Sequence, residues 1–265
     1  MFDFLAHAMS PHPHLKLVAD AVLCGNSPAM IWADDPCDPR AALMWDKAHC
    51  FYLLGASEHA EFNRTLGQHF AETIAPDMHT RKLGVFKVDC TNDAWREHIN
   101  LIFPGITFRP LPRTFFALAQ PRVRDWAERV PSDFAMRPIT RELLNGHLQN
   151  THALIGEIES CWNSLDDFCE RGFGFCLTNA DAIAGWCTAE YVSTNQCGIG
   201  IETIEAFQNR GFATLMASAF VEYCAAHRIA PHWDAAQSNT PSLAVARKVG
   251  LTKILDYDVS LGWLK

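Results

Sequence analysis

The sequence predicts a mixed α/β fold built in two parts. Short apolar strands alternate with segments of helical periodicity along the chain, and 49% of its 265 residues are apolar. A segment with two prolines and three arginines, residues 120–131, separates two such series. This length and apolar content can form one large core or two ordinary ones. We therefore expect an N-terminal α/β domain at residues 1–120 and a second domain at residues 132–265.

The order of strands and helices is clearer in the second half of the chain than in the first. Helices are expected after Thr140, which caps the first of them, and over 155–165, 212–226 and 241–249. The helix at 212–226 is predicted to be strongly amphipathic, with a stripe formed by Phe212, Leu215, Met216, Ala219, Phe220 and Tyr223. Strands are expected at residues 134–139, 172–177, 183–192, 197–204, 233–236, 251–255 and 257–263.

The first half repeats part of this order. A helix is expected near residues 15–23, followed by strands at 29–33, 42–45 and 50–54. A long helix then carries the stripe Phe62, Leu66, Phe70 and Ile74, within residues 58–74. A strand, a helix and a strand are expected at 83–88, 93–102 and 107–117.

Charge and composition exclude several classes of protein. The net charge is −8, whereas a nucleic-acid-binding protein normally carries a basic stripe. The acidic balance is compatible with a cationic amine substrate. Asp3 lies where a signal peptide would need basic residues, and no apolar run approaches about 20 residues. We expect a cytoplasmic protein with no membrane or nucleic-acid partner; the sequence carries no signal for its oligomeric state.

The cysteines and histidines are interpreted as structural. Ten cysteines without Cys-x-x-Cys spacing indicate reduced, mostly buried apolar side chains. The alternative is a catalytic thiol at Cys161, Cys169 or Cys176. Three histidines lie near Pro11 and Pro13, which favours a flexible N-terminal segment over a metal site; they are His7, His12 and His14. No metal is expected.

A turn between strand 197–204 and helix 212–226 is the most informative segment. It consists of Gln208, Asn209, Arg210, Gly211, Phe212 and Ala213. The first turn of a helix has unpaired N–H groups and the positive end of the macrodipole. The first carboxylate within this helix is Glu222, so the helix start carries no acid. A strand, a glycine-containing turn and a helix start together favour phosphate binding.

This turn resembles the acetyl-CoA turn of the GCN5-related N-acetyltransferase (GNAT) family, Gln/Arg-x-x-Gly-x-Gly/Ala. Ile201-Glu202-Thr203-Ile204 is similar to the family's fourth strand, and Asn239-x-x-Ser242 with Gly250-Leu251 is similar to its last helix. The resemblance covers about residues 133–257. It looks closest to a two-domain bacterial branch that includes self-resistance proteins acetylating the aminopolyol antibiotic zwittermicin.

The resemblance implies a mixed sheet of six or seven strands with helices on both faces. Because the first half repeats part of this pattern, we interpret it as a degenerate GNAT copy; an unrelated α/β cap is the alternative. The equivalent turn begins at Gly55, and Glu58 and Glu61 follow it. Two carboxylates at a helix start repel a pyrophosphate, so a copy of this kind should not bind CoA.

The resemblance also implies an acetyl-CoA-dependent N-acetyltransferase that acts on a small-molecule amine by direct attack in a ternary complex. The strand backbone would pair with pantetheine, and the turn would hold the pyrophosphate. The donor site so implied consists of Glu202, Thr203, Ile204, Gln208, Asn209, Arg210, Gly211, Phe212, Ala213, Thr214, Asn239 and Ser242. An acceptor pocket could be lined by Trp162, Phe168, Phe173 and Trp186, although aromatic residues at such spacing more often form core.

The general base and the general acid are less clearly assigned than the donor site. Glu202, on a strand expected to be half-buried, and Asp234 are the two candidate bases. Ala246 occupies the position where many family members carry a tyrosine. The candidate general acid is therefore Tyr257, and Ser242 or water is a weaker alternative. The same departure motivates an alternative function, a non-catalytic CoA-binding sensor or interaction protein. Transfer of a longer acyl group, or transfer to a hydroxyl, is a third possibility.

Overall fold

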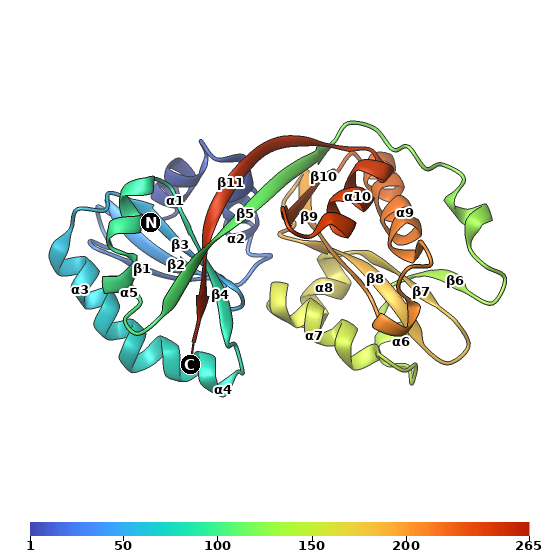
Figure 1. The fold of residues 1–265 in the computed structure, drawn as a ribbon, viewed down its shortest axis with the longest axis horizontal. Coiled ribbons are helices and arrows are strands. Elements are labelled where there is room, and N and C mark those ends of the chain that lie inside the picture. The colour runs from blue at the N-terminus through green and yellow to red at the C-terminus, as the bar shows by residue number, and fades with distance from the viewer. Residues whose placement is uncertain (265) are drawn as a thin grey trace. The chain divides into compact units, whose positions relative to one another are not determined.

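The computed structural model describes residues 1–264 and contains two compact units (Figure 1). Unit 1 comprises Met1–Ala19, Pro28–Pro112 and the segment that begins at Asp258. Unit 2 comprises Asp20–Ser27 and Arg113–Tyr257. In contrast to the continuous ranges 1–120 and 132–265 expected from the sequence, each unit is assembled from separate segments. The reason is that two long strands contribute residues to both units.

Unit 1 contains an N-terminal helix pair, a sheet and the helices packed on it. Its elements are α1 (Phe2–Met9), α2 (Pro13–Leu23), β1 (Met30–Ala33), β2 (Ala41–Trp45), β3 (Cys50–Gly55), α3 (Ala60–His69), the π-helical turn η1 (Phe70–Ile74), α4 (Ala75–Thr80), β4 (Val85–Cys90), the 3-10 turn η2 (Asp93–Glu97), α5 (Ile99–Ile102) and the first part of β5 (Thr107–Leu118). The last residues of α2 belong to unit 2. The N-terminal segment, expected to be flexible, is therefore helical, and its prolines lie between the two helices and at the first position of α2.

Aromatic side chains form the core of unit 1. The stripe predicted for residues 62–74 is confirmed, since all four of its side chains are buried. Phe51, Phe70, Phe86 and Phe103 pack edge-on or tilted, with ring centroids 5.0–6.2 Å apart. Such geometry is the preferred one for aromatic clusters.

Unit 2 has the same alternation of strands and helices. Its elements are the second part of β5, η3 (Trp126–Arg129), β6 (Ala135–Pro138), α6 (Arg141–Leu144), α7 (Thr151–Cys161), α8 (Leu165–Arg171), β7 (Gly174–Thr178), β8 (Ile183–Glu190), β9 (Gln196–Thr203), η4 (Glu205–Phe207), α9 (Phe212–His227), β10 (Ala230–Ala236), α10 (Thr240–Val249) and the first part of β11 (Leu251–Trp263). The two terminal strands predicted at 251–255 and 257–263 are thus one strand. The described residues form eleven strands in all.

The sheet of unit 2 is mixed, as predicted. β6, β7, β8 and β9 are antiparallel neighbours, β10 is parallel to β9, and β5 is antiparallel to β10. Helices cover both faces. On one face α9 brings Met216 close to Gly185 of β8. On the other face α7 brings Glu157 to Glu190 of the same strand.

Helix α9 differs from its predicted amphipathic character. It is buried on nearly every side, through Phe212, Leu215, Met216, Ala217, Ser218, Ala219, Phe220, Val221 and Cys224. The reason is that α10 and η3 also pack against it, and Trp126 of η3 donates a hydrogen bond to Glu222.

Among the described residues, none of the helices combines the length and apolar character that a bilayer crossing requires.

The two units share a connection pattern. In unit 1 the antiparallel strands β1, β2 and β3 are followed by α3 and by β4, which is parallel to β3. In unit 2 the antiparallel strands β7, β8 and β9 are followed by α9 and by β10, which is parallel to β9. Each series is completed by an antiparallel strand from the other half of the chain, β11 beside β4 and β5 beside β10. This repetition supports the interpretation of unit 1 as a second copy.

Candidate active site

The parallel strands β9 and β10 of unit 2 separate along their length. They pair at three positions, Ala230↔Gln196, Pro231↔Cys197 and His232↔Gly198. β9 continues to Thr203 and β10 to Ala236, but the pairing between them ends at His232 and Gly198. The facing edge of β9 is therefore available to an extended group with amides of its own, which could pair with it as an added strand does.

The turn between η4 and α9 has several backbone N–H groups without a protein acceptor among the described residues. Asn209 and Gly211 have left-handed backbone conformations, with φ of 62° and 79°. Within the described chain, the N–H groups of residues 209–213 donate to no protein acceptor. A Cβ added at Gly211 would meet nothing within 4 Å, so the backbone conformation, rather than crowding, favours glycine there. Converging N–H groups at a helix start form an anion-binding concavity.

Side chains fix this turn in place. Gln208 Nε2 donates to the carbonyl oxygen of Thr203 at 3.0 Å, which ties the turn to the end of β9. Arg210 Cζ lies 5.8 Å from the ring centroid of Phe207 and 6.0 Å from that of Phe212. Both contacts are in the range of cation–π attraction, so the guanidinium is held beside the N–H groups. The first turn of α9 has no acidic residue, as expected.

Asn239 and Ser242 have protein partners at the start of α10. Asn239 Oδ1 accepts a hydrogen bond of 3.2 Å from the N–H of Ser242, which is the helix cap expected for this asparagine. Ser242 Oγ accepts one of 2.9 Å from Trp233 Nε1. The serine hydroxyl thus anchors a buried indole of β10, which disfavours it as a general acid.

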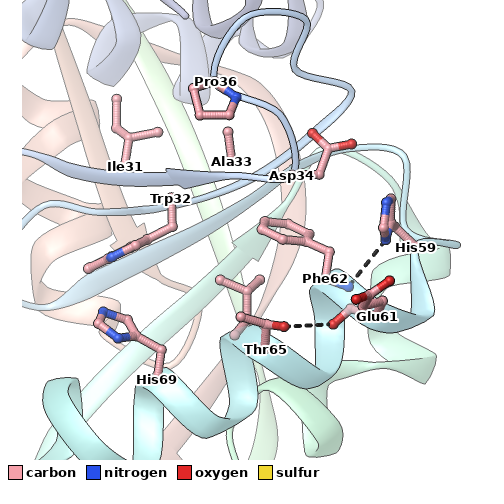
Figure 2. Close-up of a pocket in the computed structure, with 11 residues that line it drawn as sticks. Ile31, Trp32, Ala33, Asp34, Pro36, His59, Glu61, Phe62, Thr65 and His69 are labelled. Carbon is pink, nitrogen blue, oxygen red and sulfur yellow. Dashed lines mark hydrogen bonds between the residues drawn. The ribbon is translucent and has the colours of Figure 1, made fainter.

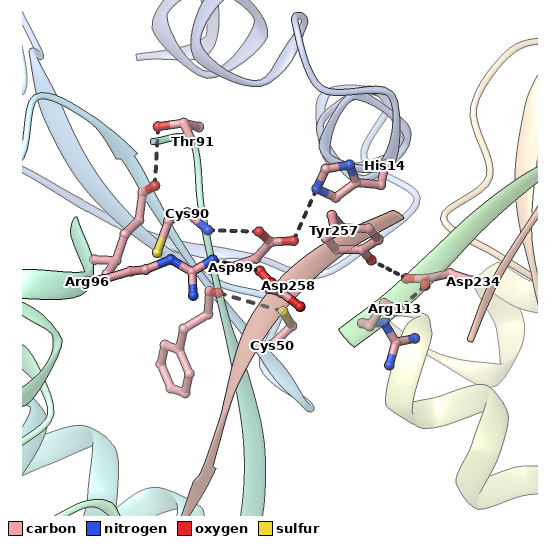
Figure 3. A network of polar contacts seen from close by, with 12 residues as sticks. His14, Cys50, Asp89, Cys90, Thr91, Arg96, Arg113, Asp234, Tyr257 and Asp258 are labelled. Atoms are coloured by element: carbon pink, nitrogen blue, oxygen red, sulfur yellow. Dashed lines mark hydrogen bonds and ion pairs between the residues drawn. The ribbon is translucent and has the colours of Figure 1, made fainter. Parts of the chain in front are cut away.

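The predicted base Asp234 and the predicted acid Tyr257 contact each other (Figure 3). Tyr257 OH donates to Asp234 Oδ2 at 2.6 Å, and Arg113 Nε donates to Asp234 Oδ1 at 3.0 Å. Burial alone would lower the pKa of Arg113, but Asp234 and Tyr257 raise it above its ordinary value. Both oxygens of Asp234 are already bonded to protein donors, which disfavours this carboxylate as the base.

Glu202 lies on the face of the sheet that α7 covers. It is opposite Trp186 of β8 and is exposed, so the expectation of a half-buried carboxylate is wrong. A second carboxylate, Glu157 of α7, was missed by sequence reasoning. Burial raises the pKa of Glu157, a hydrogen bond with Glu190 opposes this, and the charge of Glu202 adds to the rise. A glutamate on an amphipathic helix is normally solvent-exposed, so the sequence gives no signal for it.

The predicted acceptor-pocket aromatics belong to the core. Trp162, Phe168 and Trp186 are each at most 3% exposed, and Trp162 Nε1 donates to the carbonyl oxygen of Ala189 at 2.9 Å. Phe173 stacks on Phe220, with centroids 4.9 Å apart. These residues therefore take the core role that their spacing favoured.

The thiol and metal alternatives find little support. Burial raises the pKa of Cys176 to about 12, and burial also raises the pKa of Cys169. A catalytic cysteine needs the thiolate, which such an environment disfavours. His14 Nε2 lies 3.3 Å from Asp89 Oδ2, a contact also visible in Figure 3. Within residues 1–264, no three histidine, cysteine or acidic side chains are grouped as metal ligands would be.

The equivalent gap in unit 1 is closed. Thr91, just after β4, donates its N–H to the carbonyl oxygen of Leu53 at 3.0 Å, and its hydroxyl accepts from the N–H of Gly55 at 3.0 Å. The carbonyl oxygen of Gly55 accepts from Asn92 Nδ2 at 2.7 Å and from Trp95 Nε1 at 3.1 Å. The ends of β3 and β4 are thus joined by hydrogen bonds. The edge of β3 that corresponds to the available edge of β9 is therefore already paired with protein groups.

The helix start after β3 is also occupied. His59 Nδ1 accepts a hydrogen bond from the N–H of Phe62 at 3.2 Å, and Glu61 lies in the first turn of α3. Unit 1 has instead a cavity of about 690 Å³ between β1 and α3 (Figure 2). It is lined by Ile31, Trp32, Ala33, Asp34, Pro36, His59, Glu61, Phe62, Thr65, Leu66 and His69. None of these belongs to the predicted donor site.

A mixed sheet with a splayed parallel pair, followed by an anion-binding turn that opens a helix, defines the fold of an acyltransferase of the GCN5-related type. Residues 12–260 match the GNAT acetyltransferase family. The chain belongs to this family and is an acyltransferase.

Relatives and solved structures agree with this assignment. An uncharacterized N-acetyltransferase of Bacillus subtilis (strain 168), YdfB, is 21% identical over 239 residues, which cover 90% of this chain and 87% of that protein. A GCN5-related N-acetyltransferase-like protein from Streptococcus suis 89/1591 has a TM-score of 0.72 at 19% identity, over 99% of this chain and 98% of that one. A tandem GNAT protein from the clavulanic acid biosynthesis pathway has a TM-score of 0.58 at 12% identity, over 99% and 92% of the two chains. The structural likenesses establish a shared fold.

Proposed function

We propose that this protein transfers an acetyl group from acetyl-CoA to the amine of a small molecule, by direct attack in a ternary complex. The observation that carries the proposal is the contrast between the two units. Unit 2 combines separated strands with an unpaired anion-binding turn, whereas the corresponding strands of unit 1 are joined and its helix start is capped.

The donor fits the residues of unit 2. The turn would hold the pyrophosphate through the N–H groups of residues 209–213 and the guanidinium of Arg210, while Gln208 fixes the turn. The N–H of Thr214, which was expected to contribute, donates instead to the carbonyl oxygen of Gly211 at 3.0 Å. The edge of β9 over residues 202–204 would pair with the amides of the pantetheine arm, and Asn239 and Ser242 would border that arm at the start of α10. When bound, the donor supplies an acyl group activated by a thiolate leaving group.

The acceptor must lose a proton before its nitrogen can attack. Of the two predicted bases, Glu202 has no side-chain hydrogen bond among the described residues, whereas Asp234 has two. Glu202 lies on β9, the strand that borders the gap, where it would contribute negative charge beside the acceptor. Asp234 bonds to both Tyr257 and Arg113, so we assign Asp234 and Tyr257 to positioning β10 and β11 rather than to proton transfer. Ala246 is fully buried and offers no hydroxyl, so solvent would protonate the leaving sulfur.

A thermal-shift titration with acetyl-CoA, with dephospho-CoA and ATP as controls, tests the donor site. We expect a saturable rise in melting temperature that is largest for acetyl-CoA. The same preparation is then assayed for release of CoA thiol over a panel of amines. No shift at millimolar acetyl-CoA overturns the proposed function. Tight binding without thiol release for any amine supports the alternative function, a non-catalytic CoA sensor.

A further inference from the structure

On the face of unit 2 opposite α9, β8 and β9 align three polar side chains. Thr188 lies opposite Gly200, Glu190 opposite Gly198, and Trp186 opposite Glu202. Directly opposed residues of antiparallel strands point to the same side of the sheet. Thr188, Glu190 and Glu202 therefore share one face, and the two glycines leave part of that face without side chains.

Glu190 occupies the space above one of these glycines. A Cβ placed on Gly200 would overlap Glu190 Oε1 and would lie 2.8 Å from Thr188 Oγ1. Helix α7 covers this face and brings the Glu157 carboxyl to hydrogen-bond with Glu190. The Glu190 carboxyl and the Thr188 hydroxyl thus lie over a glycine of the strand that borders the donor gap, and the Glu157 carboxyl contacts that of Glu190.

The hydroxyl of Thr188 is the unsatisfied member of this group. Thr188 is 2% exposed, and its Oγ1 has no hydrogen-bond partner within the described part of the chain. A buried hydroxyl normally has a partner, because leaving it unpaired forfeits its bond to water. An unpaired oxygen beside the Glu190 carboxyl is suited to receive a hydrogen bond from a ligand that also bonds to that carboxyl group.

The charges around this position are acidic or neutral. Glu157 faces it from α7, Glu190 from β8 and Glu202 from β9. On β10, His232 lies in register with Gly198, and burial lowers its pKa, although a backbone hydrogen bond at Phe116 opposes the shift. The histidine is therefore mostly neutral near pH 7. A positively charged group fits this site, and a carboxylate-bearing ligand does not.

We propose that Glu157, Glu190 and Thr188 bind the ammonium group of the acceptor, and that the Glu157–Glu190 pair accepts its proton. This inference rests on the proposed function and specifies its substrate class, a small aliphatic amine without a carboxylate of its own. Glu202 would stand at the exposed side of the site and contribute charge. The acceptor would thus approach on the α7 face of the sheet.

The proton balance is simple. In the form with both carboxyl groups ionised, the pair takes one proton from the acceptor R–NH₃⁺ and then shares it in the Glu157–Glu190 hydrogen bond. The acceptor becomes R–NH₂, whose lone pair forms the new bond to the acyl carbon. The bond between that carbon and sulfur breaks, and the electron pair leaves on sulfur. The nitrogen then loses a second proton, which goes through solvent to the thiolate. The proton held by the pair returns to water at the end of the cycle.

The environment of Glu157 suits this task. Its pKa is raised, with burial as the largest cause, in spite of the hydrogen bond with Glu190. A carboxylate with a raised pKa is a better match for an ammonium group than an ordinary exposed one. The sharing of a hydrogen bond between two carboxyl groups also keeps them close when one of them is protonated.

Three variants test the inference: Glu157→Gln, Thr188→Val, and Glu159→Gln as the matched control on the exposed side of α7. The probes are 1,4-diaminobutane, n-butylamine and 4-aminobutyrate. With CoA present, binding of each amine is followed by calorimetry, and acetylation with acetyl-CoA is followed as thiol release between pH 6 and 9. All variants should keep the acetyl-CoA thermal shift of the wild type.

We expect the wild type to bind and acetylate the two amines without carboxylates at least tenfold better than 4-aminobutyrate. Thr188→Val should weaken amine binding about tenfold. Glu157→Gln should lower kcat at least a hundredfold and remove the acid limb of the pH profile, whereas Glu159→Gln should behave as wild type. Equal behaviour of the two Gln variants overturns the inference, as does an acetyl-CoA shift without binding of any of the amines. Loss of the acetyl-CoA shift in the wild type overturns the proposed function instead.

Discussion

Tyr257 and Asp234 are joined by a hydrogen bond of 2.6 Å, from the tyrosine hydroxyl to Oδ2 of the carboxylate. Arg113 holds the other oxygen at 3.0 Å. The three side chains come from β11, β10 and β5, so the contact links three neighbouring strands. Sequence reasoning had assigned the two residues separate parts in catalysis, whereas their geometry gives them one structural task.

Tyr257→Phe tests that task. Loss of one hydrogen bond should destabilise the protein by about 1 kcal/mol, because an average intramolecular bond contributes about that much. We expect kcat to fall less than tenfold, since a general acid typically contributes about 10²–10⁴-fold. Steady-state kinetics and urea unfolding measure the two effects. A hundredfold loss of kcat at unchanged stability would restore Tyr257 as the acid.

Gly211→Asp and Gly211→Asn form a matched pair for the donor turn. The backbone of Gly211 has φ of 79°, which Asn and Asp tolerate better than other residues, and an added side chain meets open space. The variants differ mainly in one negative charge before the start of α9. We expect acetyl-CoA affinity to be at least tenfold lower for the Asp variant than for the Asn variant, by calorimetry.

A control for this pair is available in unit 1. Gly105 has φ of 78° and no atom within 4 Å of an added Cβ. Gly105→Asp should therefore carry a similar conformational cost while acetyl-CoA affinity stays at the wild-type value. If the Asp and Asn variants at position 211 bind acetyl-CoA equally, the turn does not hold the pyrophosphate.

Acetyl-CoA should bind once per chain. The strand ends in unit 1 are joined through Thr91 and Gly55, and the N–H of Phe62 is capped by His59. Unit 1 therefore lacks both the edge and the helix start that unit 2 offers. Calorimetric titration should give a stoichiometry close to one, and a value near two would contradict the closed gap.

Glu157→Gln should stabilise the protein at neutral and alkaline pH. Burial raises the pKa of Glu157 above its ordinary 4.5, so its ionised form is disfavoured in the folded state. Its favourable contribution is complete below the unfolded pKa and is lost as pH rises through the folded pKa. A gain of about 1 kcal/mol would raise the melting temperature by roughly 2–4 °C at pH 8.

The same comparison made near pH 4.5 should show little difference between Glu157→Gln and the wild type, because the carboxyl group is then protonated. Differential scanning calorimetry at both pH values, with Glu159→Gln as the reference, measures this. A variant less stable than the wild type at pH 8 would show that the ionised carboxylate is well accommodated, against the argument from burial.

Thiol reactivity should follow burial. Cys24 and Cys37 are exposed, whereas five cysteines are buried and three are partly buried. Among the partly buried ones, burial raises the pKa of Cys90 to about 12. Titration of the folded protein with a disulfide reagent should give two fast thiols, and titration in denaturant should give ten. More than two fast thiols would mean that buried segments open readily.

Local sequence patterns predicted most of the strands and helices, whereas contacts between residues far apart in the sequence could not be predicted. Most strand and helix positions follow from periodicity and turn residues, and the glycine-containing turn before α9 lies within one short segment, so their places could be predicted. The helix expected over 155–165 is an exception, because α7 ends at Cys161 and α8 begins at Leu165. Pairing partners are decided by contacts far apart in the sequence, which is why β11 was taken for two strands of one domain. The approach of Glu157 to Glu190 joins a helix and a strand, and no spacing rule relates them. Glu202 was misjudged because strand periodicity gives the face of a sheet and not what covers it.

The strand that completes unit 1 comes from the last part of the chain. Val88 of β4 pairs with Ser260 of β11, and Phe86 pairs with Gly262. During synthesis β4 therefore keeps one uncovered edge until β11 has also been made. An exposed strand edge invites pairing with other chains. The order of synthesis thus leaves the edge of β4 open to intermolecular pairing until β11 is available to cover it.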